Sequence, residues 1–477
     1  MSKNASYMSG RRGLENGLFE QLVESGKSDS GAANETYRQL AQDFMLGDAT
    51  VLGTASFYDF LREENRGKKA YVCNGTACLV AGTQDAVHSK LREHFAEDEI
   101  GHVCCLGRCH ENSSFQFGGD NYSGLSGDEI DSAIAGGKGK ADTYPVGSNL
   151  SSPLMTAPFP GVDEFYGLFK EVLRQDADSV LDEIVAACIR GRGGAGFPAG
   201  IKWKTTRSVQ ADQKYVVCNA DEGDPGAYTD RYLMEEQPHL VLFGMMVAGY
   251  LTGADTGVLY IREEYPESVR IMTDAVAELT AAGLLGDDID GSGFSFKFKV
   301  IEGAGAYICG EETALLASLE GQRPEVRIRP PFPAVEGLFR KPTVLNNVET
   351  FALVPAALRM GGAEFAKVGT GRSSGSKLVS LDSAFRTPGV YEIEMGTPFL
   401  EIIEKFGGGF RRPIKAVQVG GPLGGVVPVA EFANLTLDFE SFNQGGFLLG
   451  HAGVVGIPEE FPMLNYIEHL FEFTAAE

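Results

Sequence analysis

The chain has 477 residues, a formal net charge of −24 at pH 7 and 43% hydrophobic residues. A chain of this length predicts about three domains, each with its own core. The acidic balance argues against nucleic acid or an anionic membrane as partner, and no apolar run approaches the roughly 18 residues that a membrane-spanning helix needs. Residues 1–31 are polar and lack the apolar stretch of a signal peptide, so we expect a cytoplasmic protein.

Helical patterns fill about 31–65, and a cysteine-rich region follows them. Four of the eight cysteines form two pairs, Cys73-Asn-Gly-Thr-Ala-Cys78 and Cys105-Leu-Gly-Arg-Cys109. Thiolates at these spacings, brought together from two loops, suit the iron atoms of a [2Fe-2S] cluster. Structural zinc is the nearest alternative, although zinc favours tighter Cys-x-x-Cys pairs, and a disulfide framework fits poorly in a large chain with no secretory signal.

The next part of the chain combines a linker, a helix, a strand and two loops. The stretch 136–158 is rich in Gly, Ser and Pro, which is typical of a linker. Apolar residues at helical spacing predict a helix over 179–189, and a glycine-rich loop follows it. The apolar run 214–219 predicts a strand whose tip delivers the acidic loop 220–226.

Two glycine-rich segments, 190–203 and 303–312, combine bare backbone with charged or aromatic residues. Glycines let backbone N–H groups approach phosphate oxygens, and Lys202 can neutralise the anion, so the segments suit a flat, phosphorylated cofactor. Two ordinary turns are the alternative. Gly191-x-Gly193-x-x-Gly196 matches the dinucleotide fingerprint, but a helix precedes it where that fingerprint requires a strand.

Several of these motifs resemble a known family. The two glycine-rich segments and the stretches 218–231, 330–334 and 342–350 closely resemble the NADH-oxidising flavoprotein subunit of respiratory complex I. They are also similar to the diaphorase subunit of NAD-reducing hydrogenases and formate dehydrogenases. The resemblance runs from about residue 179 to the C-terminus. The segments 37–41, 53–58 and 115–125, with the four cysteines, resemble the thioredoxin-like ferredoxin subunit of the same complexes, here fused to the flavoprotein.

The resemblance implies non-covalently bound FMN with NAD(H) stacked on the flavin, and it implies the residues that bind them. The implied flavin contacts are Gly191, Arg192, Gly193, Lys202, Asn219, Asp221, Glu222, Tyr307, Gly310, Glu311, Glu312, Asn346 and Asn347. The implied NAD(H) contacts are Gly194, Phe197, Lys202, Glu312 and Phe332, with the two Phe rings as stacking partners for adenine. Glu222 and Glu312 are the catalytic candidates. Hydride transfer needs positioning of the nicotinamide more than acid or base catalysis.

Two further points depend on the family pattern. Asp224 and Ala227-Tyr228 stand where the family has Glu and a Thr or Ser followed by Phe, which puts the fine tuning of nucleotide binding in question. The cluster ligands implied are Cys73, Cys78, Cys105 and Cys109, because Cys105, rather than Cys104, begins the Cys-Leu-Gly-x-Cys signature.

The expected fold is an α/β multidomain chain with a thioredoxin-like ferredoxin domain, a Rossmann-like FMN and NAD domain and a ubiquitin-like β-grasp domain. We predict a strand over 388–393 and a helix over 399–406, and the glycines of 420–425 favour a structural turn over a third phosphate site. The predicted boundaries are a helical lead-in at 1–70, the [2Fe-2S] domain at 71–136, a linker at 137–159, the FMN and NAD domain at 160–367, the β-grasp domain at 368–461 and the start of a helical bundle at 462–477.

The other cysteines suggest what the chain does not bind. Cys188, Cys218 and Cys309 are expected to be buried small hydrophobes. The family's Cys-x-x-Cys-x-x-Cys motif for a [4Fe-4S] cluster is not in this sequence, which ends in an amphipathic helical pattern at 464–477, so we expect a truncation or a natural loss of that cluster. The predicted function is an NADH:acceptor oxidoreductase module working with other iron–sulfur subunits of a hydrogenase, formate dehydrogenase or complex I-like assembly. The alternative is a nucleotide-binding electron-transfer or assembly scaffold with little turnover.

Overall fold

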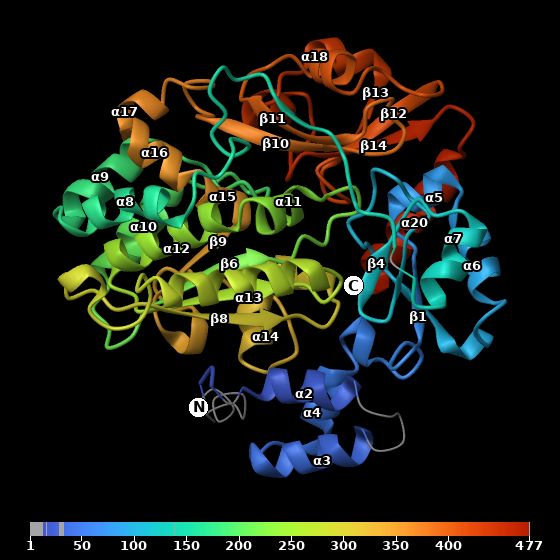
Figure 1. The fold of residues 1–477 in the computed structure, drawn as a ribbon, viewed down its shortest axis with the longest axis horizontal. Coiled ribbons are helices and arrows are strands. Elements are labelled where there is room, and N and C mark those ends of the chain that lie inside the picture. Colours follow the sequence, from blue (N-terminus) through green and yellow to red (C-terminus); the bar gives the residue numbers. More distant parts are fainter. Residues whose placement is uncertain (1–12, 16, 28–32, 138, 477) are drawn as a thin grey trace.

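A computed structural model describes residues 13–15, 17–27, 33–137 and 139–476 (Figure 1). Predictions for residues 1–12, 16, 28–32, 138 and 477 lie outside the described residues. The predicted helices near the N-terminus are present as α2 (Leu18–Lys27), α3 (Ala33–Asp43) and α4 (Asp48–Ala55). Helices α2 and α4 pack with α3 around a small apolar cluster of their own, at the bottom of the molecule in Figure 1.

The cysteine-rich region is a small α/β unit with a four-stranded sheet in the order β2-β1-β3-β4. Its strands are β1 (Ala70–Cys73), β2 (Ile100–Val103), β3 (Phe115–Phe117) and β4 (Asp120–Tyr122), and its helices are α5 (Thr76–Ala81), α6 (Gln84–Leu91) and α7 (Gly127–Ile134). Strands β1 and β2 are parallel, with Cys73 opposite Val103. The segments that follow these two strands therefore leave the sheet at the same edge. Cys73 ends β1, Cys78 lies in the following helix α5, and Cys105 and Cys109 lie in the loop after β2.

The central region holds a parallel sheet in the order β8-β7-β6-β9. The strands are β6 (Tyr215–Ala220), β7 (Thr256–Ile261), β8 (Lys297–Glu302) and β9 (Thr343–Asn347). The helices around it are α8 (Val162–Leu173), α9 (Ala177–Ala186), α10 (Ala199–Ser208), α11 (Thr229–Glu236), α12 (Pro238–Thr252), α13 (Pro266–Ala281), α14 (Glu312–Leu319), α15 (Val348–Ala352) and α16 (Val354–Met360). The predicted helix over 179–189 and strand over 214–219 are confirmed as α9 and β6.

Helices bury the central sheet on both of its faces. All six residues of β7 are buried, because helices cover both faces of the sheet, α12 and α13 on one side and α14 on the other (Figure 1). The carboxyl ends of all four parallel strands face the same edge. Loops at such an edge form the usual ligand-binding crevice of open α/β sheets.

The third region contains a six-stranded sheet in the order β13-β12-β14-β10-β11-β5. Its C-terminal strands are β10 (Ser376–Leu381), β11 (Gly389–Glu394), β12 (Ile414–Val419), β13 (Gly425–Pro428) and β14 (Gly453–Pro458), and its helices include α19 (Phe439–Gln444). Helix α17 (Gly362–Phe365) precedes this region and packs on α9 and α16 of the central region. The predicted strand over 388–393 is confirmed as β11. The predicted helix over 399–406 is α18 (Phe399–Glu401) continued by the π-helical turn Ile402–Phe406.

The stretch 137–159, predicted as a linker, contributes to the third region. Its strand β5 (Val146–Ser148) pairs in parallel with β11 at the edge of the six-stranded sheet. Further along, the buried carboxylate of Glu392 accepts backbone N–H groups from Leu154, Met155 and Thr156 at 2.8, 3.1 and 3.0 Å. This connection is therefore bound to the sheet over much of its length.

The end of the chain forms helix α20 (Met463–Ala476), as predicted. Tyr466 is buried on its inner side, and the ring of Phe473 lies 4.9 Å from the ring of Tyr307 in the second glycine loop. Among the described residues, no helix has both the length and the apolar character required to cross a membrane.

Of the three cysteines expected to be buried small hydrophobes, two are as predicted. Cys218 and Cys309 are buried, but Cys188 is exposed, so the prediction of burial is wrong there. Helix α9 ends before Cys188, and the residue takes a left-handed conformation with φ of 52°. Its side chain thereby leaves the apolar face that the helical pattern had predicted.

Candidate functional site

The first glycine loop meets the carboxyl end of the central sheet. Asn219 and Asn347 are register partners at the ends of the neighbouring strands β6 and β9. A Cβ added at Gly193 would lie 3.0 Å from the Cβ of Asn347, so the loop approaches this strand end more closely than most side chains would allow. The loop therefore lies directly against the end of β9, and Gly193 itself stays exposed to solvent.

Helix α10 supplies a cation to the same edge. Lys202 Nζ donates a hydrogen bond to the carbonyl of Leu345 at 2.8 Å and lies 3.2 Å from Glu312 Oε2. The other carboxylate oxygen of Glu312 lies 2.8 Å from Arg329 Nη1. The next residue of the helix, Trp203, is fully buried and donates from Nε1 to Asn346 Oδ1 at 2.9 Å. A partly exposed cation is thus fixed between the two glycine loops.

The second glycine loop approaches the strand ends from the other side. Its short helical turn Tyr307–Gly310 places the Gly310 carbonyl 2.7 Å from Asn219 Nδ2, which donates to it. The carboxylate of Glu311 then caps helix α14 by accepting the N–H groups of Thr313 and Ala314 at 2.8 and 2.9 Å. Asn219 therefore connects the sheet directly to this loop.

Asp224 links the second glycine loop to the acidic loop. Tyr307 donates from its hydroxyl to Asp224 Oδ1 at 2.7 Å, and a Cβ added at Gly223 would lie 2.8 Å from the Tyr307 ring. Burial raises the pKa of Asp224 to about 6. A Cβ added at Gly421 would lie 2.2 Å from this carboxylate, so the loop 420–425, predicted to be a turn, packs against the site.

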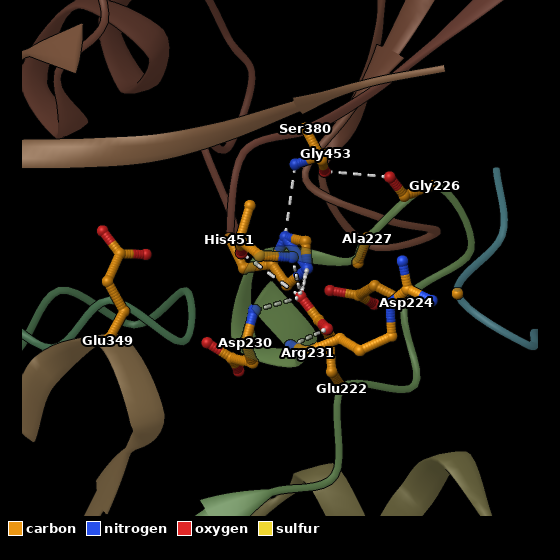
Figure 2. Close-up of polar contacts among 12 residues, drawn as sticks. Glu222, Asp224, Gly226, Ala227, Asp230, Arg231, Glu349, Ser380, His451 and Gly453 are labelled. Atoms are coloured by element: carbon orange, nitrogen blue, oxygen red, sulfur yellow. Dashed lines mark hydrogen bonds and ion pairs between the residues drawn. The ribbon is translucent and has the colours of Figure 1, made fainter. Parts of the chain in front are cut away.

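The carboxylate of Glu222 points into the protein (Figure 2). It accepts the backbone N–H groups of Thr229, Asp230 and Arg231 at 2.7, 2.9 and 3.0 Å and so caps helix α11. Burial raises the pKa of Glu222 despite these hydrogen bonds. His451 Nε2 lies 3.6 Å from this carboxylate, and burial lowers the pKa of His451 to about 3, so its ring is neutral there. The contacts of the Glu222 carboxylate are structural.

Arg192 also has an internal side chain. Its guanidinium is fully buried, donates from Nη2 to the Ser374 carbonyl at 2.5 Å and lies 3.9 Å from Glu349. Its backbone N–H donates to Thr350 Oγ1 at 2.9 Å. The structure thus brings together the two glycine loops, Lys202, Asn219 and Glu312, while the charged groups of Arg192 and Glu222 face the interior. Asp221 is half-buried just past the end of β6.

Two aromatic rings remain accessible near the glycine loops. Phe197 is 52% exposed and Phe332 is 56% exposed, high fractions for large apolar side chains. Gly194 precedes Phe197 with φ of 123°, a backbone conformation that favours glycine. Both predicted adenine-stacking rings are therefore free to receive a planar group, which fits their expected role.

The four paired cysteines converge in one buried place. Each is at most 2% exposed, and the sulfur atoms of Cys105 and Cys109 lie 3.3 Å apart. A Cβ added at Gly75 would lie 3.5 Å from the sulfurs of both Cys73 and Cys105, which places the two loops face to face. Hydrogen bonds from the Cys109 and Cys73 thiols lower the pKa of Cys105, which favours a thiolate.

Backbone geometry adds to the case for an iron–sulfur site. The N–H groups of Gly75 and Gly107 donate to the sulfurs of Cys73 and Cys105, each at 3.4 Å. Such N–H···S bonds are one of the features by which proteins tune iron–sulfur clusters. Cys104 is only half-buried and follows the end of strand β2. Cys73, Cys78, Cys105 and Cys109 are four buried thiols in two pairs, which fits a [2Fe-2S] cluster.

The cysteine-rich region, which holds the thiol site, packs against both the central and the third region. The backbone N–H of Ser383 donates to the Cys109 carbonyl at 3.0 Å, and the buried cysteines belong to the same apolar core as Tyr228 and Tyr265 of the central region. Arg262, directly after β7, also contacts the cysteine loop. The sequence gives no local signal for these contacts, because a single Arg or Tyr after a strand has many uses.

Comparison with known proteins gives the same assignment. The family model described as the Nuo51 FMN-binding domain matches residues 184–356, and the model for a thioredoxin-like [2Fe-2S] ferredoxin matches residues 17–138. A subunit of the NADH-quinone oxidoreductase of Rhizobium meliloti (strain 1021) is 46% identical over 298 residues, which cover 62% of this chain and 70% of that protein. NADP-reducing hydrogenase subunit HndC of Solidesulfovibrio fructosivorans is 42% identical over 315 residues, which cover 66% of this chain and 64% of that protein.

One relative extends over more of the chain. The alpha subunit of the NAD-reducing hydrogenase HoxS of Cupriavidus necator is 34% identical over 436 residues, which cover 86% of this chain and 72% of that subunit. A crystal structure of an NAD+-reducing [NiFe]-hydrogenase in the air-oxidized state matches with a TM-score of 0.84 and 28% identity, over 100% of this chain and 82% of that one. The chain therefore belongs to the family of the FMN-binding subunits of NADH-quinone oxidoreductase and their counterparts in NAD-reducing hydrogenases, and it carries a thioredoxin-like [2Fe-2S] ferredoxin domain at its N-terminal end.

Proposed function

We propose that this chain is an NADH:acceptor oxidoreductase module that exchanges a hydride between NAD(H) and FMN and passes single electrons to iron–sulfur carriers. One observation carries the proposal: a glycine-lined sheet edge with Lys202 and the Asn219–Asn347 pair lies in the same chain as four converging buried thiols. Bound FMN would supply the conversion between a two-electron hydride and single electrons.

The chain's own residues position the reactants. The glycine loops present backbone N–H groups without a Cβ, and Lys202 places one positive charge between them, as binding of a phosphorylated flavin requires. Asn219 and Asn347 stand at the strand tips, where an amide can hold the polar edge of a ring. Phe197 and Phe332 offer faces for adenine.

The two carboxylates named as catalytic candidates have different roles in this proposal. Glu312 lies between Lys202 and Arg329 at the open edge, where it can orient a bound nucleotide. Glu222 acts through the backbone: by capping α11 it fixes the acidic loop that ends strand β6. Neither carboxylate needs to exchange a proton in the hydride step.

Electron partners and compartment belong to the same proposal. Relatives are subunits of hydrogenase and quinone oxidoreductase assemblies, so we propose other iron–sulfur subunits of such an assembly as partners. All eight cysteines lie within the described residues and none forms a disulfide, which supports a reducing compartment such as the cytoplasm.

The test is reconstitution of the purified full chain with FMN, followed by anaerobic addition of NADH. We expect flavin absorbance that NADH bleaches, and NADH-dependent reduction of an artificial acceptor such as ferricyanide. A Cys105→Ser variant serves as control, because the hydride step requires the flavin site and no cluster. Flavin that binds but is not bleached would instead favour the scaffold function, and a chain that retains no flavin would contradict both.

A further inference from the structure

A buried arginine connects the two predicted cofactor loops. Arg262 follows strand β7 directly and is 2% exposed. Its Nη1 donates to the Glu222 carbonyl at 2.5 Å, and its Nη2 donates to the Cys104 carbonyl at 2.9 Å. One guanidinium group therefore spans from the acidic loop after β6 to the cysteine loop after β2.

The residues after Arg262 hold the same face of the iron–sulfur domain. A Cβ added at Gly107 would lie 2.7 Å from the ring of Tyr265, so this ring fills the space against the cysteine loop. The Tyr265 hydroxyl donates to Glu222 Oε2 at 3.2 Å, and Asn121 donates from Nδ2 to the Glu264 carbonyl at 2.7 Å. The acidic loop and the iron–sulfur domain are thus fixed to one short segment.

The charge of Arg262 has a close counter-ion two residues along the chain. Glu264 Oε1 lies 2.6 Å from Arg262 Nη2, and both side chains are almost completely buried. Buried charges act over longer distances than exposed ones because water does not screen them.

We infer that Arg262 is a positioning residue that fixes the cysteine loop on the acidic loop and raises the reduction potential of the cluster held by the four thiols. The inference rests on the [2Fe-2S] site of the proposed function. A reduced cluster carries one more negative charge than an oxidised one, so a buried cation beside it favours the reduced state. Glu264, the paired anion, has the opposite effect.

The test is a redox titration of the cluster in the reconstituted full chain, followed by electron paramagnetic resonance. We expect Arg262→Met to raise the oxidised-to-reduced ratio at a fixed potential by about tenfold, which equals about 59 mV for one electron. Glu264→Gln should shift the ratio in the opposite direction. Arg262→Lys retains the charge while losing one of the two carbonyl contacts, and should stay within about twofold of the parent chain.

Opposite shifts distinguish this role from general loss of packing, because both variants break the same ion pair. Arg270→Gln is the matched control, since it removes an exposed ion pair of 3.0 Å to Asp120 across the same interface and should leave the potential unchanged. Thermal unfolding of the cluster-free chains shows whether each variant folds. If Arg262→Met does not fold, the other two variants test the inference. It then requires that Glu264→Gln lowers the oxidised-to-reduced ratio and that Arg262→Lys leaves the potential nearly unchanged.

Two results count against the inference, and they are distinguishable. Shifts in the same direction for Arg262→Met and Glu264→Gln, or no shift in either, overturn it while the cluster signal of the parent chain remains. A parent chain that forms no [2Fe-2S] signal after reconstitution overturns the proposed site and this inference with it.

Discussion

The ammonium group of Lys202 lies 3.2 Å from the carboxylate of Glu312, and this pair joins helix α10 to the start of α14 between the two glycine loops. Each partner retains a second contact, Lys202 with the Leu345 carbonyl and Glu312 with Arg329. The lysine is therefore held in place before any ligand binds. Such preorganisation lowers the entropic cost of binding an anionic cofactor.

Lys202→Ala should weaken FMN binding about tenfold or more, because a charge-assisted hydrogen bond contributes roughly 1.5 to 3 kcal/mol. The measurement is the dissociation constant of FMN from flavin fluorescence. Lys204→Ala is the matched control, since Lys204 is on the same helix with a 64% exposed side chain. Equal affinities for the two variants would show that Lys202 does not contact the flavin.

Replacing any of Cys73, Cys78, Cys105 and Cys109 with Ser should abolish or strongly distort the visible and paramagnetic spectra of the cluster, because each supplies one thiolate. Cys104→Ser should leave both spectra unchanged, since Cys104 is half-buried beside the set of four. Iron content per chain is the second measurement. A chain that requires Cys104 and tolerates loss of Cys105 would shift the third ligand by one residue.

Phe332→Ala should raise the KM for NADH more than it lowers kcat. A ring that stacks on adenine is remote from the nicotinamide, so it contributes equally to binding of the ground and transition states. Steady-state oxidation of NADH with ferricyanide measures both constants. Val335→Ala removes a nearby apolar side chain that is 45% exposed and should change neither. A fall in kcat with unchanged KM would place Phe332 near the reacting atoms instead.

Asp224→Asn should stabilise the folded chain relative to the parent, and this difference in stability should be larger at high pH than at low pH. Burial raises the pKa of Asp224 from 3.8 to about 6, so the folded state holds this proton more tightly than the unfolded state does. The resulting stabilisation is complete below the unfolded pKa and disappears as pH rises through the folded one. Two pKa units correspond to about 3 kcal/mol.

Thermal unfolding of the parent and Asp224→Asn at about pH 4.5 and about pH 8 checks this prediction. The Tm of the Asn variant minus the Tm of the parent should be larger at about pH 8 than at about pH 4.5. Asp182→Asn, with a side chain that is 72% exposed, should show no such change. A difference in Tm that does not vary with pH would mean that Asp224 titrates alike in both states.

The sequence predicted those elements that carry a strong local pattern. Apolar spacing correctly predicted helix α9 and strand β6, and cysteine spacing predicted a four-thiol site that the structure brings together. Strand β5 was missed, because Val146-Gly-Ser148 is short and lies in a Gly- and Ser-rich stretch. Its strand conformation results from pairing with β11, far away in the sequence.

The sequence also did not predict the direction in which some side chains point. Glu222 belongs to an acidic loop that the family resemblance assigns to the flavin, yet its carboxylate caps α11, seven to nine residues later in the chain. Arg262 contacts the carbonyl of Cys104, 158 residues away, and no pattern near either residue indicates that contact. Contacts of this kind depend on how domains dock, which local periodicity does not encode.

The strand β5 also determines how this protein can be divided for experiments. A fragment that begins at residue 160 would contain all the flavin-site residues but would lose the strand that covers the edge of β11. Its Glu392 carboxylate would lose the three backbone N–H groups that now surround it. An uncovered strand edge favours pairing with other chains and therefore aggregation. Cuts between the ferredoxin and flavin halves should therefore fall before residue 146, and proteolytic fragments that retain β5 should be the ones that remain in solution.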